Sequence, residues 1–233
     1  MSIAENIARV SQAIAQAATA AGRAPADVHL LAVSKTFGAD AVIEAAQAGQ
    51  SAFGENYLQE ALDKMQAVRD RRADLSLAWH FIGPIQSNKT RPIAEHFDWV
   101  HSVDREKIAQ RLSDQRPDGL PPLQVCLQVN VSGEDSKSGV APDEVLPLAR
   151  AVAKLPRLCL RGLMAIPEPA ETFDAQRPPF RRLRELQAHL AAHGLHTDTL
   201  SMGMSADMAA AIAEGATIVR VGTAIFGKRD YAK

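Results

Sequence analysis

The sequence predicts an α/β fold, a closed (β/α)8 barrel of parallel strands ringed by helices and preceded by an extra N-terminal helix. Strand-like and helix-like segments alternate about eight times along the chain, a pattern typical of a parallel sheet covered by helices. The length of 233 residues is close to the ~250 of a typical barrel. An open doubly wound sheet also fits the alternation. The number of strands and the length favour a single barrel domain over residues 1–233.

The first segment is predicted to be an amphipathic helix outside the alternating pattern. Its apolar positions recur at helical spacing and are Ile3, Ile7, Val10 and Ile14. Ser2 and Glu5 have the spacing of a capping box, in which each side chain bonds the other's backbone amide. Gly22 and Pro25 are predicted to end this helix.

The remaining elements follow from apolar runs and from helical periodicity. The predicted strands are residues 28–35, a short run ending at 56, then 78–83, 99–103, 123–131, 158–166, 199–202 and 217–226. The predicted helices are residues 39–48, 58–69, a segment after Asn88, a segment capped by Asp104, then 142–154, 180–193 and 206–213. The Pro-rich stretch 167–179 is predicted to be a loop at the end of a strand.

Composition narrows the class of protein. The hydrophobic content of 46% is enough for one core, and a net charge of -1 argues against a nucleic-acid partner. The basic clusters 69–72 and 181–184 are interleaved with acids and are interpreted as solvated helix faces. No membrane span or signal peptide is evident, which predicts a cytoplasmic protein without a membrane partner. Cys126 and Cys159 lie in strand-like runs and are predicted to be buried, inert thiols.

Lys35 is the most informative residue, because it ends the apolar run 28–35. A buried strand rarely finishes on an ammonium group, since removing the charge from water is costly. The carboxyl ends of parallel strands are also where α/β folds place their chemistry. A partly desolvated lysine there loses its proton more readily and can form a Schiff base. The alternative is a lysine whose stem packs at the strand end while its amine reaches solvent.

The last two predicted strands end in segments suited to a phosphate. Ser201, Gly203 and Ser205 follow one strand, and Gly222 and Thr223 follow the other. In a barrel these two strand ends commonly hold a phosphate, and the eighth strand lies beside the first. The glycines could instead only turn the chain. Together with Lys35, the two segments predict a lysine facing a phosphate cup.

These motifs identify a family resemblance that runs from residue 32 to residue 227. The matching segments, in order, are AVSKT (32–36), FGENY (53–57), HFIGPIQSNK (80–89), VNVS (129–132), SKSG (136–139), RGLM (161–164) and the two cup segments. The chain resembles the pyridoxal phosphate homeostasis protein family, whose members are single TIM barrels related to the alanine racemase N-terminal domain. Any single short segment is a weak signal, whereas the whole set in this order is specific for the family.

The resemblance implies a vitamin B6 protein that holds pyridoxal 5'-phosphate (PLP) as a Schiff base on Lys35. The residues it assigns to cofactor binding are Lys35, Asn56, Ser201, Gly203, Ser205, Arg220, Gly222 and Thr223. Arg220 would lie beside the pyridine nitrogen, where a permanent positive charge disfavours protonation of the ring. Carbanion chemistry is then poorly supported, because the unprotonated ring is a weaker electron sink.

The same resemblance predicts a non-catalytic carrier of PLP, a monomer whose partners are the cofactor and PLP-dependent apoenzymes. Racemases of this group add a β domain with a second acid/base tyrosine, whereas Tyr57 and Tyr231 are the only tyrosines here. Tyr57 is predicted to pack against the cofactor ring. Two alternatives stay open, a PLP-dependent amino-acid racemase and a cofactor-free Schiff-base aldolase acting on a sugar phosphate.

Other chemistry-bearing residues carry weaker signals. His80 and His101 lie in strand runs without partners at metal-ligand spacing, so satisfied core histidines are favoured over ligands. Residues 87–89 are interpreted as a helix N-cap. Lys137 offers a second amine, although a solvated loop lysine is the simpler interpretation. No glycine-rich nucleotide motif occurs.

Overall fold

The chain forms a closed barrel of eight parallel strands in which β1 pairs with both β2 and β8. The structure is a computed structural model, and it describes residues 1–132 and 138–228. The strands are β1 (His29–Val33), β2 (Ala52–Glu55), β3 (Ala78–Phe81), β4 (Trp99–Val103), β5 (Leu123–Gln128), β6 (Leu158–Met164), β7 (Thr199–Ser201) and β8 (Ile218–Val221). The predicted barrel is therefore confirmed, and the open sheet is excluded by the pairing of β1 with β8.

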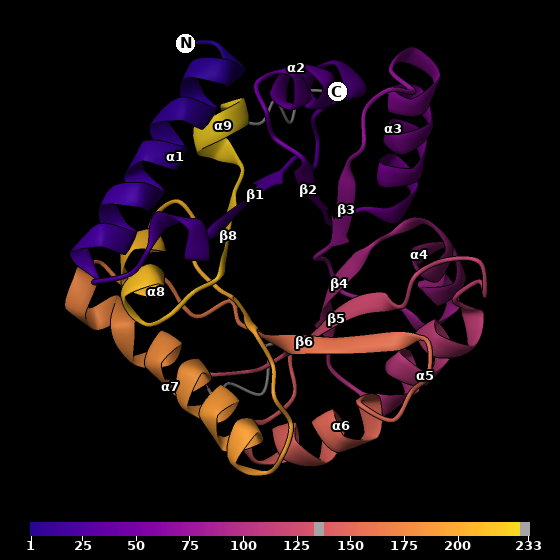
Figure 1. Cartoon of the computed structure of the whole chain (residues 1–233), viewed down its shortest axis with the longest axis vertical. Coiled ribbons are helices and arrows are strands. Elements are labelled where there is room, and N and C mark those ends of the chain that lie inside the picture. Colours follow the sequence, from indigo (N-terminus) through magenta and orange to yellow (C-terminus); the bar gives the residue numbers. More distant parts are fainter. Residues whose placement is uncertain (133–137, 229–233) are drawn as a thin grey trace.

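Helices surround the barrel and follow the strands in turn (Figure 1). They are α1 (Ile3–Ala20), α2 (Ala39–Gln47), α3 (Leu58–Arg71), α4 (Thr90–His96), α5 (Glu106–Gln115), α6 (Val145–Val152), α7 (Phe173–Ala192), α8 (Met208–Ala213) and α9 (Thr223–Phe226). The short 3-10 helices are η1 (Pro25–Asp27), η2 (Ser87–Lys89) and η3 (Pro142–Glu144). In the described part of the chain, no helix is long and apolar enough to cross a membrane.

The extra N-terminal helix α1 closes the outside of the seam between the first and last strands. The capping box is present, since Glu5 N donates to Ser2 Oγ and Ser2 N donates to the Glu5 carboxylate. Ile7, Val10 and Ile14 are buried, as the periodicity predicts. In Figure 1 the helix runs alongside α8 and α9, and Asn6 Nδ2 donates to Ile225 O at 2.8 Å.

Helix α7 corrects the prediction of a loop over 167–179, because the helix already begins at Phe173. Thr172 caps it by accepting a hydrogen bond from Ala175 N at 3.2 Å. Pro178 and Pro179 lie inside the helix, where each lacks an amide donor. Burial of Phe180 on the same helix compensates, since burying a large apolar side chain contributes about 1.5–3 kcal/mol.

Two further helix boundaries differ from the predictions. The segment 217–226 is a strand only as far as Val221, and Thr223–Phe226 forms the short helix α9, because the chain turns at Gly222 where the sheet ends. Asp104 does not cap α5. The N-cap is Arg105, and Asp104 instead pairs with the Arg105 guanidinium at 2.8 Å.

The basic cluster on α7 is more than a solvated face. Glu214, at the end of α8, is fully buried and contacts Arg177 at 2.7 Å, Arg181 at 3.2 Å and Arg184 at 3.0 Å. Burial opposes the charged carboxylate, but the guanidinium groups outweigh burial and lower the pKa of Glu214. These arginines therefore join α7 to α8.

The two cysteines have opposite environments. Cys126 on β5 is fully buried, and burial raises the pKa of its thiol to about 12, as expected for an inert group. Cys159 is exposed, so the prediction that both are buried is wrong for this residue. Cys159 is the second residue of β6, at the edge of the barrel where the strand begins.

Candidate functional site

Lys35 follows the carboxyl end of β1, at the rim of the barrel. Val33 and Ser34 are buried, whereas Lys35 is only half-buried and Thr36 is exposed. The chain thus leaves the core at Lys35, as the sequence predicts. An amine in this position is partly shielded from water and still reachable by a ligand above the strand ends.

Strand β8 brings Gly222 and Thr223 next to the end of β1, which leads into Lys35. The pairing Leu31↔Arg220 and Ala32↔Val221 puts Gly222 level with Val33. A Cβ added at Gly222 would lie 3.0 Å from Val33 O and 3.4 Å from Val33 Cβ, which is tighter than an ordinary contact. A side chain at Gly222 would require the two strand ends to move apart by a few tenths of an ångström, so glycine suits this approach. The ends of β1 and β8 thus lie side by side, as the sequence predicts.

The loop after β7 is held against β8 by backbone contacts. Arg220 N donates to Gly203 O at 2.9 Å. Gly203 has a φ of +97°, and a Cβ on it would lie 2.6 Å from Ala211 Cβ. Asp207 accepts from Met204 N at 2.6 Å and fixes the turn that leaves Ser205 exposed. Ser205 and the exposed Thr223 are thus the hydroxyls that face outward at this rim.

Arg220 points into the barrel and is 4% exposed. Its Nη1 donates to Ser201 Oγ at 2.8 Å and its Nη2 donates to Ala165 O at 3.0 Å. Burial lowers the pKa of Arg220 to about 10, with Asp207 and Cys126 acting in the opposite direction, so the group stays charged at neutral pH. Ser201, expected in the phosphate cup, is fully buried and uses its hydroxyl on Arg220 and His101.

A buried polar network below Lys35 was not predicted from the sequence. Lys64 Nζ lies 2.6 Å from Glu55 Oε1 and donates to Ser34 O at 2.8 Å. Ser34 Oγ donates to the same Glu55 oxygen at 2.6 Å. Burial raises the pKa of Glu55, and Lys64 opposes that rise. The signal in the sequence was Lys64 itself, which lies within the apolar stripe of α3 beside Ala61, Met65 and Val68.

The same network holds strained backbone immediately after Lys35. Thr36 has a φ of +70°, and no other non-glycine residue in the described chain has a positive φ. Its amide donates to Glu60 Oε1 at 2.7 Å, and that oxygen also accepts from Lys64 Nζ at 3.0 Å. A residue in this region costs about 1–3 kcal/mol and persists where its surroundings hold it. Lys35 is therefore fixed from both sides, at Ser34 and at Thr36.

Asn56 lies at the end of β2 on the same rim. Its Oδ1 is buried and finds no hydrogen-bond partner in the described part of the chain. Gly83, after β3, packs so closely on Asn56 that any Cβ would overlap the Asn56 backbone. An unpaired buried acceptor is costly, and a donor from a bound ligand would remove that cost.

The weaker candidates have four different outcomes. His80 and His101 are buried and hydrogen bonded to each other at 2.8 Å, as predicted for core histidines, and the described residues contain no group arranged to hold a metal ion. Residues 87–89 form the 3-10 helix η2, which runs into α4 without a side-chain cap. Tyr57 is 52% exposed. Lys137 and Tyr231 lie outside the described residues.

The comparisons with known proteins agree with this architecture. The sequence profile of the alanine racemase N-terminal domain matches residues 3–230. A pyridoxal phosphate homeostasis protein of Pseudomonas aeruginosa is 68% identical over 229 residues, covering 98% of this chain and 96% of the relative. The protein of that name from Escherichia coli K12 is 55% identical over 231 residues, covering 99% of this chain and 98% of the relative.

A solved structure extends the similarity to the fold. PipY of Synechococcus elongatus, solved with PLP bound, has a TM-score of 0.82 and 38% identity, covering 97% of this chain and all of PipY. The fold and the rim residues define a barrel of the alanine racemase N-terminal domain class. Within that class, the chain belongs to the pyridoxal phosphate homeostasis protein family.

Proposed function

We propose that this chain is a PLP-binding protein of vitamin B6 homeostasis, which holds the cofactor through Lys35 without robust catalytic turnover. The observation that carries the proposal is the half-buried Lys35 just after β1, at the strand end that lies beside the end of β8 with Gly222 and Thr223. The name shared by its relatives and the PLP bound to PipY support it.

The residues at the rim fit such a ligand. Exposed hydroxyls on Ser205 and Thr223 and the open backbone at Gly222 suit a phosphate. The buried Asn56 Oδ1 lacks a partner in the described chain and suits a ligand donor. When bound, PLP supplies an aldehyde that condenses with a primary amine and a ring that withdraws electrons.

Each residue then has a definite role. Lys35 presents the amine, and the Glu55–Lys64 pair beneath it keeps the strand end in place. Ser205, Gly222 and Thr223 bind the phosphate, and Ser201 orients Arg220. With PLP bound, the charged guanidinium of Arg220 would disfavour protonation of a ring nitrogen placed beside it, and would so weaken the electron sink that catalysis on amino acids requires.

The test of binding is an absorption spectrum of the purified protein, followed by borohydride treatment and peptide mapping. We expect the borohydride-fixed label on the peptide that contains Lys35 and its complete loss in Lys35→Ala. Lys107→Ala, at an exposed position of α5, should keep the label. A label found only on Lys137 or another lysine would contradict the assignment.

The test of the carrier role is turnover. We expect racemase, transaminase and decarboxylase rates on common amino acids to fall below the ordinary enzyme range of about 1–10³ per second. A rate within that range for any of them would favour the racemase alternative. A trace activity is compatible with a carrier, since the single amine of Lys35 can still move a proton slowly.

The proposal extends to delivery of the cofactor. The protein would act in the cytoplasm as a monomer and supply PLP to apoenzymes. Two mixtures with the same total amount of PLP are compared, one with PLP-loaded wild-type protein and one with free PLP and the Lys35→Ala protein. The first mixture should reactivate a PLP-dependent apoenzyme faster. Light scattering should give the mass of one chain. Equal reactivation in both mixtures would argue against delivery, and a dimer mass against the monomer.

A further inference from the structure

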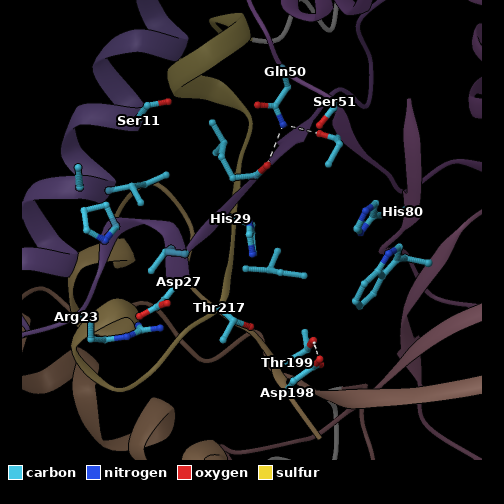
Figure 2. A pocket seen from close by; sticks show the side chains of 18 of the residues that line it. Ser11, Arg23, Asp27, His29, Gln50, Ser51, His80, Asp198, Thr199 and Thr217 are labelled. Atoms are coloured by element: carbon cyan, nitrogen blue, oxygen red, sulfur yellow. Dashed lines mark hydrogen bonds between the residues drawn. The ribbon is translucent and has the colours of Figure 1, made fainter. Parts of the chain in front are cut away.

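A large cavity lies at the opposite end of the barrel from Lys35. It has a volume of about 870 Å³ and is lined by the first residues of strands, including His29, Trp99, Thr199 and Ile218. We call it the N-terminal mouth. Figure 2 shows polar side chains from several elements around it, with His29 and His80 on different walls. Ligand sites in proteins are typically cavities of about 300–1,000 Å³ with a few converging polar groups.

A continuous chain of buried hydrogen bonds joins this mouth to Arg220. His80, which lines the mouth, bonds through Nδ1 to His101 Nε2 at 2.8 Å. His101 Nδ1 bonds to Ser201 Oγ at 2.7 Å, and Ser201 Oγ accepts from Arg220 Nη1 at 2.8 Å. We call these four residues the relay. His80 is 5% exposed, Arg220 is 4% exposed and the two between them are fully buried.

Arg220 and the single hydroxyl proton of Ser201 together set the direction of the bonds in the relay. A guanidinium can only donate, so Ser201 Oγ accepts from Arg220. Among the described residues the other partner of this buried hydroxyl is His101 Nδ1, so Ser201 gives its own proton to His101, since accepting there as well would leave that proton without an acceptor. Both imidazoles are neutral at pH 7, because burial lowers the pKa of His80 to about 3 and that of His101, with added effects of His80 and Arg220, well below its usual value. A neutral His101 therefore carries its proton on Nε2 and donates it to His80 Nδ1.

The direction of these bonds determines which ring nitrogen of His80 carries the proton. With Nδ1 accepting, its single proton is on Nε2, on the other side of the ring from His101. The relay thus presents an N–H donor at the mouth. Reversing it would leave the buried hydroxyl proton of Ser201 without an acceptor among the described residues, which is costly. A ligand atom at His80 must therefore be an acceptor.

We propose that the N-terminal mouth binds a small carboxylate, whose oxygen accepts from His80 Nε2, and that the relay couples this site to the cofactor site at Arg220. A carboxylate offers only acceptor atoms, which matches the donor on His80. The charged groups that line the mouth balance, since Arg23 and Arg161 stand against Asp27 and Asp198. Asp198 accepts two hydrogen bonds from Arg161 at 2.9 and 2.8 Å. Burial lowers the pKa of Arg23, and the charge of Asp27 opposes that change, so both acids at the mouth act on a guanidinium.

The coupling part rests on the proposed function, whereas the binding part does not. An acceptor at His80 strengthens each hydrogen bond along a polarised chain and holds Arg220 more firmly in one position. The ordering cost of placing Arg220 beside a bound ring then falls, so the carboxylate should tighten the binding of PLP. Coupling between two sites typically changes affinity by about 5–150-fold.

The first test uses the protein without cofactor. Nitrogen-15 NMR of the histidine rings should show His80 and His101 protonated on Nε2, and propionate should shift the His80 signals at millimolar concentration. Propylamine has a similar shape but offers an ammonium donor, and it should leave them unchanged. Protonation of either ring on Nδ1, an equal response to both probes, or no response to propionate would overturn the proposed site.

The second test measures coupling. Propionate should lower the dissociation constant for PLP by roughly five-fold or more in the wild-type protein and in His96→Gln, an exposed histidine on α4. His80→Phe should lose propionate binding. Ser201→Ala should still bind propionate, because the carboxylate itself selects the Nε2–H form of His80, but propionate should no longer affect PLP binding. Coupling that persists in Ser201→Ala would overturn the relay. Failure of PLP to bind at all would overturn the proposed function and leave the first test valid.

Discussion

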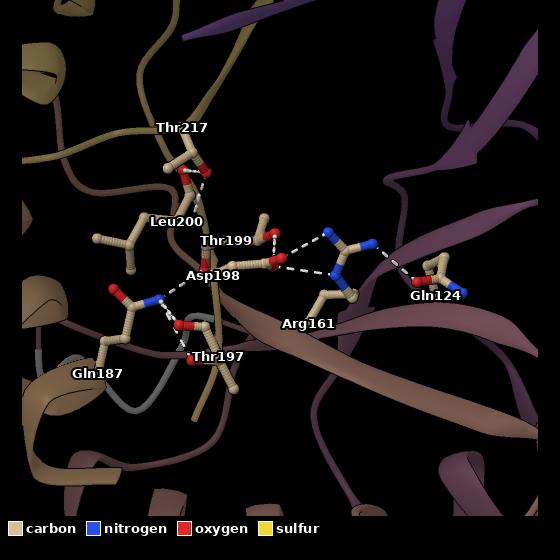
Figure 3. A network of polar contacts seen from close by, with 8 residues as sticks. All are labelled: Gln124, Arg161, Gln187, Thr197, Asp198, Thr199, Leu200 and Thr217. Atoms are coloured by element: carbon tan, nitrogen blue, oxygen red, sulfur yellow. Dashed lines mark hydrogen bonds and ion pairs between the residues drawn. The ribbon is translucent and has the colours of Figure 1, made fainter. Parts of the chain in front are cut away.

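The two ends of the barrel are built by different means. At the end that carries Lys35, the chain tolerates a φ of +70° at the non-glycine Thr36 and very close approaches at Gly203 and Gly222. At the N-terminal mouth several side chains pair with one another or with backbone. Figure 3 shows Arg161 between Asp198 and Gln124, and Gln50 Nε2 donates to Leu30 O at 2.9 Å and Ala52 O at 2.7 Å.

This difference is expected for such barrels, because ligand sites lie at the carboxyl ends of the strands and the opposite end contributes mainly to stability. Strain and unpaired polar atoms reduce stability, and they persist where a ligand later uses them. Paired side chains at the strand starts stabilise the barrel without presenting reactive groups. The Nε2–H of His80 is an exception at the mouth, and its direction follows from the buried bonds to His101, Ser201 and Arg220.

The largest predicted effect at the Lys35 end is the loss of the charge beneath it. Lys64→Met keeps the apolar stem but leaves the buried Glu55 without its cation. Removing one partner of a buried ion pair typically costs about 3–5 kcal/mol of unfolding free energy. Urea unfolding should show this loss, while Lys107→Met, on the exposed side of α5, should change little. A loss of less than about 1 kcal/mol would mean that Glu55 takes up a proton and needs no cation.

The second prediction separates the cost of a positive φ from the cost of steric overlap by an added Cβ. Gly203 and Gly194 both have positive φ, at +97° and +82°, but only at Gly203 would a Cβ meet another atom within van der Waals distance. Gly194→Ala should cost about 1 kcal/mol of stability from the backbone alone. Gly203→Ala should cost about 2–4 kcal/mol, because overlap with Ala211 is added. Equal losses in thermal unfolding would show that the Gly203 loop yields easily.

The third prediction tests the buried relay through its response to acid. The pKa of His80 is about 3 in the folded protein and about 6.5 in an unfolded chain. As pH falls from 6.5 toward 3, the unfolded state binds a proton that the folded state does not, so stability decreases. At pH 5 the loss from His80 amounts to about 2 kcal/mol. In His80→Phe the fall in stability between pH 7 and pH 5 should be smaller by that amount; an unchanged pH dependence would place the titration elsewhere.

The smallest effect is expected at the rim of the mouth. The Arg161–Asp198 pair is partly exposed, and such pairs contribute at most about 1 kcal/mol. Arg161 also lies 4.7 Å above the Trp99 ring, so Arg161→Ala should lose slightly more stability than Arg157→Ala, whose pair with Asp118 is more exposed. A loss of several kcal/mol in chemical unfolding would show that the rim holds the barrel together.

Local patterns determined the elements of this protein to a large extent. The capping box of Ser2 and Glu5, the strand Trp99–Val103 and the helix beginning at Leu58 all follow from residues adjacent in sequence. The number of strands and the chain length favoured the closed barrel over an open sheet, and the end of an apolar run predicted the position of Lys35. These features depend on the period of the hydrophobic pattern, which the sequence carries directly.

Tertiary structure decided the features that join distant residues. Helix α7 begins at Phe173 although two prolines follow, because its packing and its ion pairs with Glu214 outweigh local preference. Ser201 turns inward to Arg220 and His101, and Lys64 reaches Glu55 from the buried face of a helix. A side chain's partner depends on which atoms the closed barrel brings within hydrogen-bond distance, and the spacing of residues along the chain does not contain that information.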